Sequence, residues 1–188
     1  PGAVTQTVAG LSSGSPLSAV VGGSATPSIL RVNNASGTQT YGGMLGGAGA
    51  NENQLRLEKD GGGVLVLTQA ATYLGGTKVT AGTLRISGVD DVLPWGLAKG
   101  GVEVSGTLDL NGRNQRVNGL SGLGTGIVDN TAATDSRLTF GQENVSSTFA
   151  GRFKNTGAGK LNLVKTGSGT TSLSGASTAA GWLSIQEG

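Results

Sequence analysis

The sequence predicts an all-β fold, a right-handed parallel β-helix (β-solenoid) with about three short strands per coil. Short blocks of alternating apolar and polar residues recur about every ten residues, the spacing expected of successive short strands. Glycine supplies 36 of the 188 residues, and the chain repeats itself with a period of about 108 residues. No stretch has the 3, 4 and 7 spacing of an amphipathic helix, so we expect almost no helix.

Each block alternates in the way that gives a strand one buried face. Asp-Gly, Asn-Gly and Gly-Gly pairs separate the blocks, and these pairs favour tight turns. The expected strands are residues 55–57, 64–67, 84–86, 102–104, 108–110, 161–163 and 183–185.

The repeat is clearest between residues 55–63 (LRLEKDGGG) and 161–169 (LNLVKTGSG), which lie 106 residues apart. It extends backward, since Gln6–Leu11 (QTVAGL) matches Gln115–Leu120 (QRVNGL). We therefore divide the chain into a first copy, 1–109, and a second copy, 110–188, which we expect to be truncated. No Pro-rich or charged linker separates the copies, so residues 1–188 are expected to form one continuous solenoid.

A two-layer sandwich or barrel also fits short strands at this spacing. Only 4% of the residues are aromatic, however, and small residues crowd the turns, which favours the narrow interior of a solenoid. The predicted core is aliphatic, and its members are Leu55, Leu57, Leu65, Leu67, Val79, Leu84, Ile86, Val102, Val104, Leu108, Leu110, Leu161, Leu163, Leu173, Leu183 and Ile185.

The composition excludes several functions. There is no cysteine and no histidine, so disulfides, thiolate metal sites and histidine bases are absent. A net charge of +2 without clustered Lys, Arg and aromatic residues argues against nucleic-acid binding. No apolar run is long enough to span a bilayer as a helix.

Residues 75–84 (GGTKVTAGTL), together with residues 55–73 before them, resemble the autotransporter-associated β-strand repeat of passenger-type tandem-repeat surface proteins. The stretch from Leu163 to Gly188 is similar, but it has Ala179 where the motif has tyrosine and Gly181-Trp182 where it has paired glycines. The resemblance implies a secreted or cell-surface parallel β-helix and specifies no ligand.

Acidic residues are the strongest candidates for chemistry, because some glycosidases use two carboxyl groups about 5–10 Å apart. Asp109 and Asp129 lie 20 residues apart, close to one coil, so stacking could bring them together. We interpret the acidic residues as solvated turn or surface charges, with a catalytic or calcium role as the alternative. The candidates are Asp90, Asp91, Asp109, Asp129 and Asp135.

Two short motifs match catalytic patterns only formally. Residues 10–14 (GLSSG) fit a nucleophile elbow around Ser12, but there is no histidine to activate the serine. Residues 157–160 (GAGK) resemble part of a phosphate loop, but no helix is expected after them. Both are interpreted as turns.

Three further residues could be surface features. Asn34 and Asn144 begin formal glycosylation sequons and are interpreted as polar corners. Asp91 to Gly96 is expected to form a protruding loop, with Trp95 folded onto the flank of the solenoid rather than free for binding.

These observations predict a structural extracellular segment at the bacterial cell surface, a rigid rod or fibre of an adhesin stalk or surface coat. We expect no enzyme activity and no catalytic, cofactor-binding or metal-binding residues. The expected partners are further copies of the repeat, in the same chain or in a head-to-tail filament, and surface glycans, but neither nucleic acid nor membrane. A polysaccharide-binding or polysaccharide-cleaving β-helix, like a tailspike module, remains the alternative.

Overall fold

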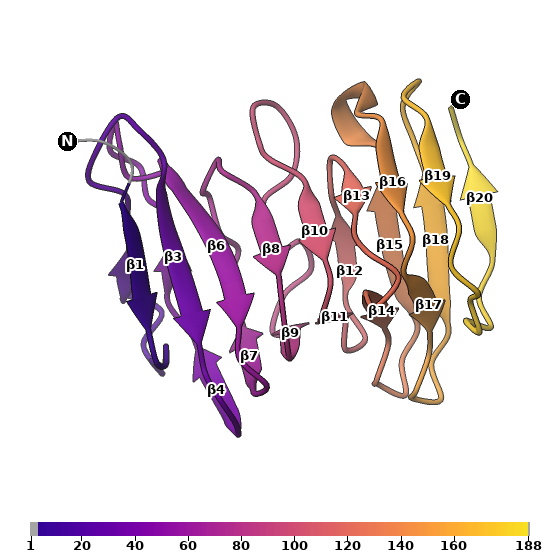
Figure 1. Cartoon of the computed structure of the whole chain (residues 1–188), viewed down its shortest axis with the longest axis horizontal. Helices are drawn as coiled ribbons and strands as arrows, with labels where there is room; N and C mark the ends of the chain where they lie inside the picture. The colour runs from indigo at the N-terminus through magenta and orange to yellow at the C-terminus, as the bar shows by residue number, and fades with distance from the viewer. Residues whose placement is uncertain (1–3, 188) are drawn as a thin grey trace.

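The computed structural model describes residues 4–187 and forms a parallel β-solenoid of about eight coils. The coils stack side by side from the N-terminal to the C-terminal end of the chain (Figure 1). Every pair of neighbouring strands in these residues is parallel, as a solenoid requires and a hairpin sandwich forbids. The predicted fold class is confirmed.

Each coil contributes to three sides of a prism. The first sheet orders β1 (Thr5–Val8), β3 (Ser28–Asn33), β6 (Leu55–Asp60), β8 (Thr77–Val79), β10 (Val102–Val104) and β13 (Leu120–Ser121). The second orders β4 (Thr38–Tyr41), β7 (Val64–Leu67), β9 (Thr83–Ile86), β11 (Thr107–Asp109), β14 (Ile127–Asp129) and β17 (Arg152–Lys154). The third orders β12 (Asn114–Arg116), β15 (Ser136–Phe140), β18 (Leu161–Lys165) and β20 (Leu183–Ile185).

Two short pairs extend these sides. The pair β16 (Ser147–Phe149) and β19 (Thr171–Leu173) continues the first side through a parallel bridge between Gly122 and Phe149. The third side begins with β2 (Ala19–Val20) and β5 (Met44–Leu45). The helical content of residues 4–187 is one 3-10 turn, Gln142–Asn144, and no helix among them has the length and hydropathy to cross a membrane.

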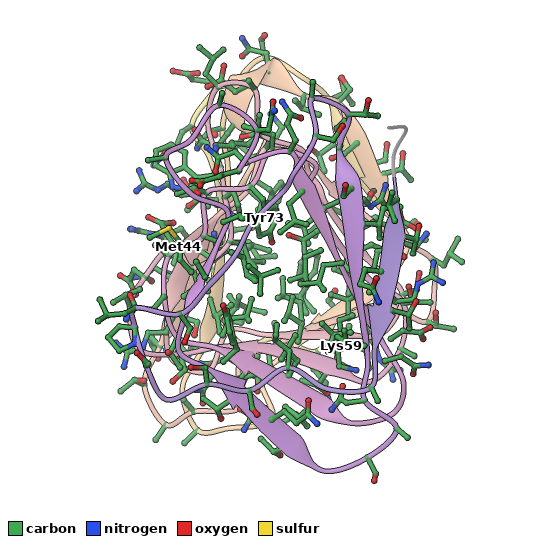
Figure 2. The ribbon with its side chains drawn as sticks, turned by 90° about the vertical axis from the view of Figure 1, so that its left-hand side faces the viewer. Met44, Lys59 and Tyr73 are labelled. Carbon is green, nitrogen blue, oxygen red and sulfur yellow. The ribbon has the colours of Figure 1, made fainter. Side chains whose placement is uncertain are left out.

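The interior is a single apolar cluster that runs along the axis from Leu30 to Leu163. Seen along the axis, the side chains fill the space inside the ring of ribbon, and Tyr73 points into it (Figure 2). The predicted core is confirmed from Leu55 through Leu163 and is wrong at its last three members. Leu173, Leu183 and Ile185 are exposed, because they lie in the last described coil and have a neighbouring coil on one side only.

The predicted loop from Asp91 to Gly96 is also partly wrong. Val92 and Leu93 are fully buried and form the third side of their coil, where Ala71 N–H donates to the Val92 carbonyl and Asp91 N–H donates to the Asn114 carbonyl. Apolar residues within a turn-rich stretch here complete the core instead of protruding.

The two copies of the sequence repeat lie on different sides of the prism. Leu55–Asp60 forms β6 in the first sheet, whereas the matching Leu161–Lys165 forms β18 in the third. Likewise β7 belongs to the second sheet, and its counterpart β19 continues the first side. The repeat therefore spans a fractional number of coils, and the second copy is turned about the axis by one side.

A column of glycines marks the corner between the first and second sides. In successive coils a glycine carbonyl accepts a hydrogen bond from the next coil, as in Val64 N–H to Gly37, Thr83 N–H to Gly63 and Thr107 N–H to Gly82. A Cβ on any glycine of this column except Gly37 would run into the backbone of the preceding coil, whereas a Cβ on Gly37 would meet open space. We call this set the glycine column; its members are Gly37, Gly63, Gly82, Gly106, Gly126, Gly151 and Gly175.

The buried tyrosines predict how stability changes with pH. Tyr73 is fully buried, its hydroxyl lies 2.5 Å from the Thr77 hydroxyl, and burial raises its pKa well above the ordinary 10.0. Burial also raises the pKa of Tyr41. The unfolded chain releases these protons near pH 10 while the folded chain keeps them, so stability is complete below pH 10 and is lost as the pH rises above it.

We expect the free energy of unfolding, measured by urea titration, to fall with pH above about 11, where the lysines of both the folded and the unfolded chain are largely deprotonated and no longer offset the effect of the tyrosines. In the Tyr73→Phe variant, the free energy of unfolding should fall less steeply with pH than in the wild type, by about 1.4 kcal/mol per pH unit. A slope equal to that of the wild type in this variant, measured by urea titrations at several alkaline pH values, would contradict the assignment.

Candidate functional site

The carboxylates of Asp109 and Asp129, which the sequence predicted to lie close together, are on adjacent coils. Asp109 on β11 and Asp129 on β14 are register partners in adjacent strands of the second sheet. They form a row of charge across four coils, since Asp109 pairs with Arg85 at 2.6 Å and Asp129 pairs with Lys154 at 3.2 Å.

The interpretation of Asp109 and Asp129 as solvated charges is wrong, because both are buried. Asp109 also accepts hydrogen bonds from Asn111 N–H at 2.9 Å and from the Thr131 hydroxyl at 2.8 Å. Asp129 accepts from the N–H and the hydroxyl of Thr156, at 2.9 and 2.7 Å. Each carboxylate thus holds the turn of the next coil against its own strand, and its oxygens face that turn instead of a cleft.

We expect Asp109→Ala to lower the free energy of unfolding by about 2–4 kcal/mol, because it leaves the half-buried Arg85 and several buried turn donors without an acceptor. Asp135 is exposed and accepts one hydrogen bond, from Lys160 N–H, so Asp135→Ala is the matched control and should cost less than about 1 kcal/mol. Urea unfolding measures both. Equal stability of the two variants would show that Asp109 does not hold the turn.

Residues 10–14 are not the turn that we predicted, because Ser13 pairs with Tyr41 in a parallel bridge on the second side, whereas residues 157–159 form the predicted bend. Ser12 lies in an exposed segment. The N–H groups of Gly157 and Gly159 donate to the carbonyls of Asn130 and Ala132 in the preceding coil, so they are engaged in coil stacking instead of facing an anion.

The two sequon asparagines differ in accessibility. Asn34 is buried and donates its amide to the Val64 carbonyl at 3.2 Å. Asn144 is exposed in the 3-10 turn, where its side-chain oxygen accepts from Ser168 N–H at 2.8 Å.

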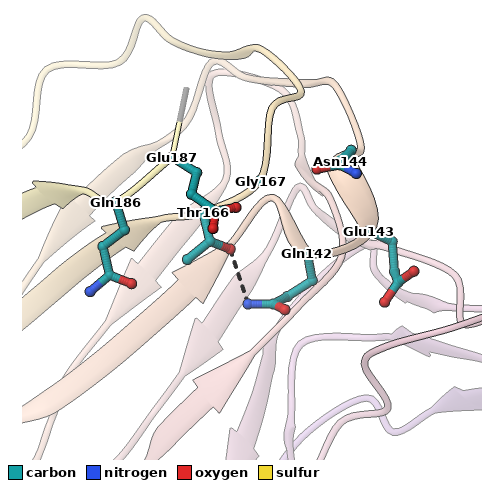
Figure 3. Close-up of a pocket in the computed structure, with 7 residues that line it drawn as sticks. All are labelled: Gln142, Glu143, Asn144, Thr166, Gly167, Gln186 and Glu187. Atoms are coloured by element: carbon teal, nitrogen blue, oxygen red, sulfur yellow. Dashed lines mark hydrogen bonds between the residues drawn. The ribbon is translucent and has the colours of Figure 1, made fainter.

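The hollow beside Asn144 has a volume of about 270 Å³ and lies between corner turns of consecutive coils (Figure 3). Gln142 donates from its amide to the Thr166 hydroxyl at 3.0 Å across it, and Glu143 and Glu187 stand at its edge. No group of three or more acidic, histidine or cysteine residues within residues 4–187 is arranged to hold a metal ion.

Two interior lysines are residues that the sequence reasoning missed. Lys59 is fully buried, and its ammonium donates to the carbonyls of Asp60 at 2.6 Å, Gly61 at 2.8 Å and Ala81 at 3.3 Å. Figure 2 places Lys59 at a corner of the prism. Because Ala81 belongs to the next coil, the ammonium links two corners. Burial lowers the pKa of Lys59, and the carboxylate of Asp60 acts in the opposite direction.

Lys165 repeats this arrangement 106 residues later, donating to the carbonyls of Thr166 at 2.8 Å and Gly167 at 2.6 Å. The signal was present in the alternation: Leu55, Leu57 and Lys59 occupy one face of β6, and Leu161, Leu163 and Lys165 one face of β18. A lysine at the end of an apolar face, directly before a turn, was the available indication.

The model of the passenger-associated-transport-repeat family matches residues 57–86 and 163–188. Each match contains one interior lysine and the turn that its ammonium binds. The adhesin BmaC autotransporter of Brucella suis biovar 1 (strain 1330) is 37% identical over 161 residues, which are 85% of this chain and 4% of that protein. The chain is an autotransporter-associated repeat protein. The resemblance inferred from the sequence is confirmed.

The autotransporter-associated repeat protein spans 4% of the length of its Brucella relative, so the match concerns one stretch of a much longer protein. No solved structure shows significant similarity to it. Within the repeat, the first matched segment runs from β6 through β7 and β8 to β9 and so visits the first and second sheets twice.

Proposed function

We propose that this segment is a rigid spacer in the passenger of a secreted or cell-surface adhesin. The observation that carries the proposal is the continuity of the backbone ladders: six strands pair in sequence in each of the first two sheets, over one apolar core. A ladder of this kind resists bending, because each coil is hydrogen-bonded to both neighbours, and its length grows with the number of repeats.

The match to a passenger repeat and the similarity to an adhesin support the adhesin setting and a non-enzymatic role. The full hydrogen bonding of Asp109 and Asp129 agrees with it, because these carboxylates already hold turns in place.

Further copies of the repeat are the proposed partners, in the same chain or head to tail. Leu173, Leu183 and Ile185 turn an apolar surface outward from the last described coil. Leu173 and Leu183, together with Phe153 and Trp182, border an apolar hollow of about 230 Å³. A further coil stacked there would cover the hollow and extend the ladders.

The proposal is tested by duplicating residues 55–160 within the chain. Since the two copies of the repeat start on β6 and β18, separated by between four and five coils, the rod should lengthen by about 22 Å at ~4.8 Å per coil. Small-angle X-ray scattering should show this longer maximum dimension with an unchanged cross-sectional radius.

A thicker particle, or two bodies joined by a flexible link, would overturn the spacer proposal. The matched control duplicates the same residues with Gly82→Val in the inserted copy. Loss of the stacking corner should then break the rod at that point.

A further inference from the structure

A polar groove on the third side of the prism is independent of the spacer role. It lies between the turn after β9 and strands β12 and β15, and its volume is about 290 Å³, at the lower end of the range for small-molecule pockets. The register of β12 and β15 places Asn114 beside Arg137 and Arg116 beside Thr139. These four side chains and the carboxylates of Asp90 and Asp91 line the groove.

One wall of the groove is held rigid by paired contacts. Asp90 accepts from the N–H and the side-chain amide of Asn114, both at 3.0 Å. Asp91 accepts from the N–H of Arg116 at 2.9 Å and from its Nε at 3.0 Å. The Arg116 guanidinium carbon also lies 3.5 Å from the centre of the Trp95 ring, so its plane is fixed from two directions.

The floor is equally fixed. Gln115 is buried beneath the groove, and its amide accepts from Leu93 N–H at 2.9 Å and donates to the Leu93 carbonyl at 2.8 Å. The loop that carries Asp90, Asp91 and Trp95 is thereby tied to β12. A ligand would find this wall and floor already in place, which lowers the entropic cost of binding.

The free hydrogen-bonding capacity of the groove defines its ligand. The Arg137 side chain is exposed and has no ion pair or hydrogen bond to any described residue. Its planar guanidinium matches a carboxylate in bidentate geometry. The remaining lone pairs of Asp90 and Asp91 can accept from hydroxyl groups. A free sulfate or doubly ionised phosphate has few or no hydroxyl groups to donate to them, whereas a saccharide has several.

We propose that this groove binds a saccharide unit that carries a carboxylate, such as a uronic acid. The carboxylate of the sugar pairs with Arg137, and its ring hydroxyls donate to Asp90 and Asp91. The two aspartates and two arginines balance in charge, so recognition depends on the placement of one carboxylate and several hydroxyls instead of on bulk charge.

The test titrates the full chain with a trigalacturonate or a triglucuronate and with a neutral trisaccharide of the same length, at physiological salt, and follows amide shifts by NMR. An acidic trisaccharide should shift the amides of residues 90–95, 114–116 and 137–139, and the neutral one should bind at least about tenfold more weakly. Arg137→Gln should lower the affinity for the acidic sugar at least about tenfold.

The matched control is Arg152→Gln, because Arg152 is also exposed but lies on β17 in the second sheet. This variant should bind as the wild type does. The proposal is overturned if neither acidic sugar binds at millimolar concentration, if neutral and acidic sugars bind equally, or if both variants lose affinity to the same extent. None of these results tests the spacer proposal, which the scattering measurement of the rod length tests separately.

Discussion

Replacing Gly82 by valine is expected to lower the free energy of unfolding by at least about 3 kcal/mol. Gly82 has a φ of +61°, a conformation that is especially unfavourable for a β-branched residue. A Cβ there would also overlap the carbonyl oxygens of Gly61 and Gly63 in the preceding coil, and crowding of this kind costs about 1–3 kcal/mol by itself. Because the overlap is with backbone, the whole corner has to shift.

Gly14→Val is the control, since nothing lies within 4 Å of a Cβ at that position. Its urea midpoint should stay close to that of the wild type. If Gly82→Val unfolded at the same urea concentration as Gly14→Val, the glycine column would not be what allows the coils to stack.

Replacing Lys59 by alanine should have the second large effect, a loss of about 3–5 kcal/mol. The change removes the ammonium that links the carbonyls of Gly61 and Ala81 in two adjacent coils. It also leaves an empty space beside Val32 and Val79, the register partners of Lys59.

Two further variants separate packing from hydrogen bonding. Lys59→Met keeps the length of the side chain and loses its donors, so it should cost less than alanine, about 1–3 kcal/mol. Lys160 is exposed, and Lys160→Ala should change stability by no more than about 0.5 kcal/mol. Urea unfolding of the three variants ranks them; a Lys59→Ala protein as stable as Lys160→Ala would refute the corner link.

The apolar periodicity was enough to predict most of the core and seven of the strands of residues 4–187, namely β6, β7, β9, β10, β11, β18 and β20. Alternation in segments such as Leu84–Ile86 and Val102–Val104 reports which residues face inward, and a parallel ladder needs little else. Exposure at Leu183 and Ile185 could not be predicted, because burial in a solenoid depends on the neighbouring coil and not only on the strand itself.

The polar interior was much harder to predict. Lys59 and Asp109 are charged residues, which are rarely buried without partners, and their partners are backbone and side-chain groups one coil away. Such contacts depend on which coil stacks against which, and a spacing of 20 residues between Asp109 and Asp129 predicted proximity but not the turn that encloses each carboxylate. The groove at Arg137 depends in the same way on the pairing of β12 with β15.

The stacking order itself is the central claim, and the distance between coils tests it most directly. The chain has no cysteine, so two spin labels can be attached at introduced cysteines without background. Thr7, Glu103 and Ser121 lie in one outward row of the first sheet, reached through successive register partners.

Double electron–electron resonance measures the distance between two such labels. At ~4.8 Å per strand, it should give about 19 Å between positions 7 and 103, which are four strands apart. It should give about 24 Å between positions 7 and 121, which are five strands apart. A stepwise increase of this size is the result that a parallel solenoid predicts. Equal distances for the two pairs, or a shorter one to Ser121, would mean that the strands fold back on each other and that the coils do not stack in the order of the chain.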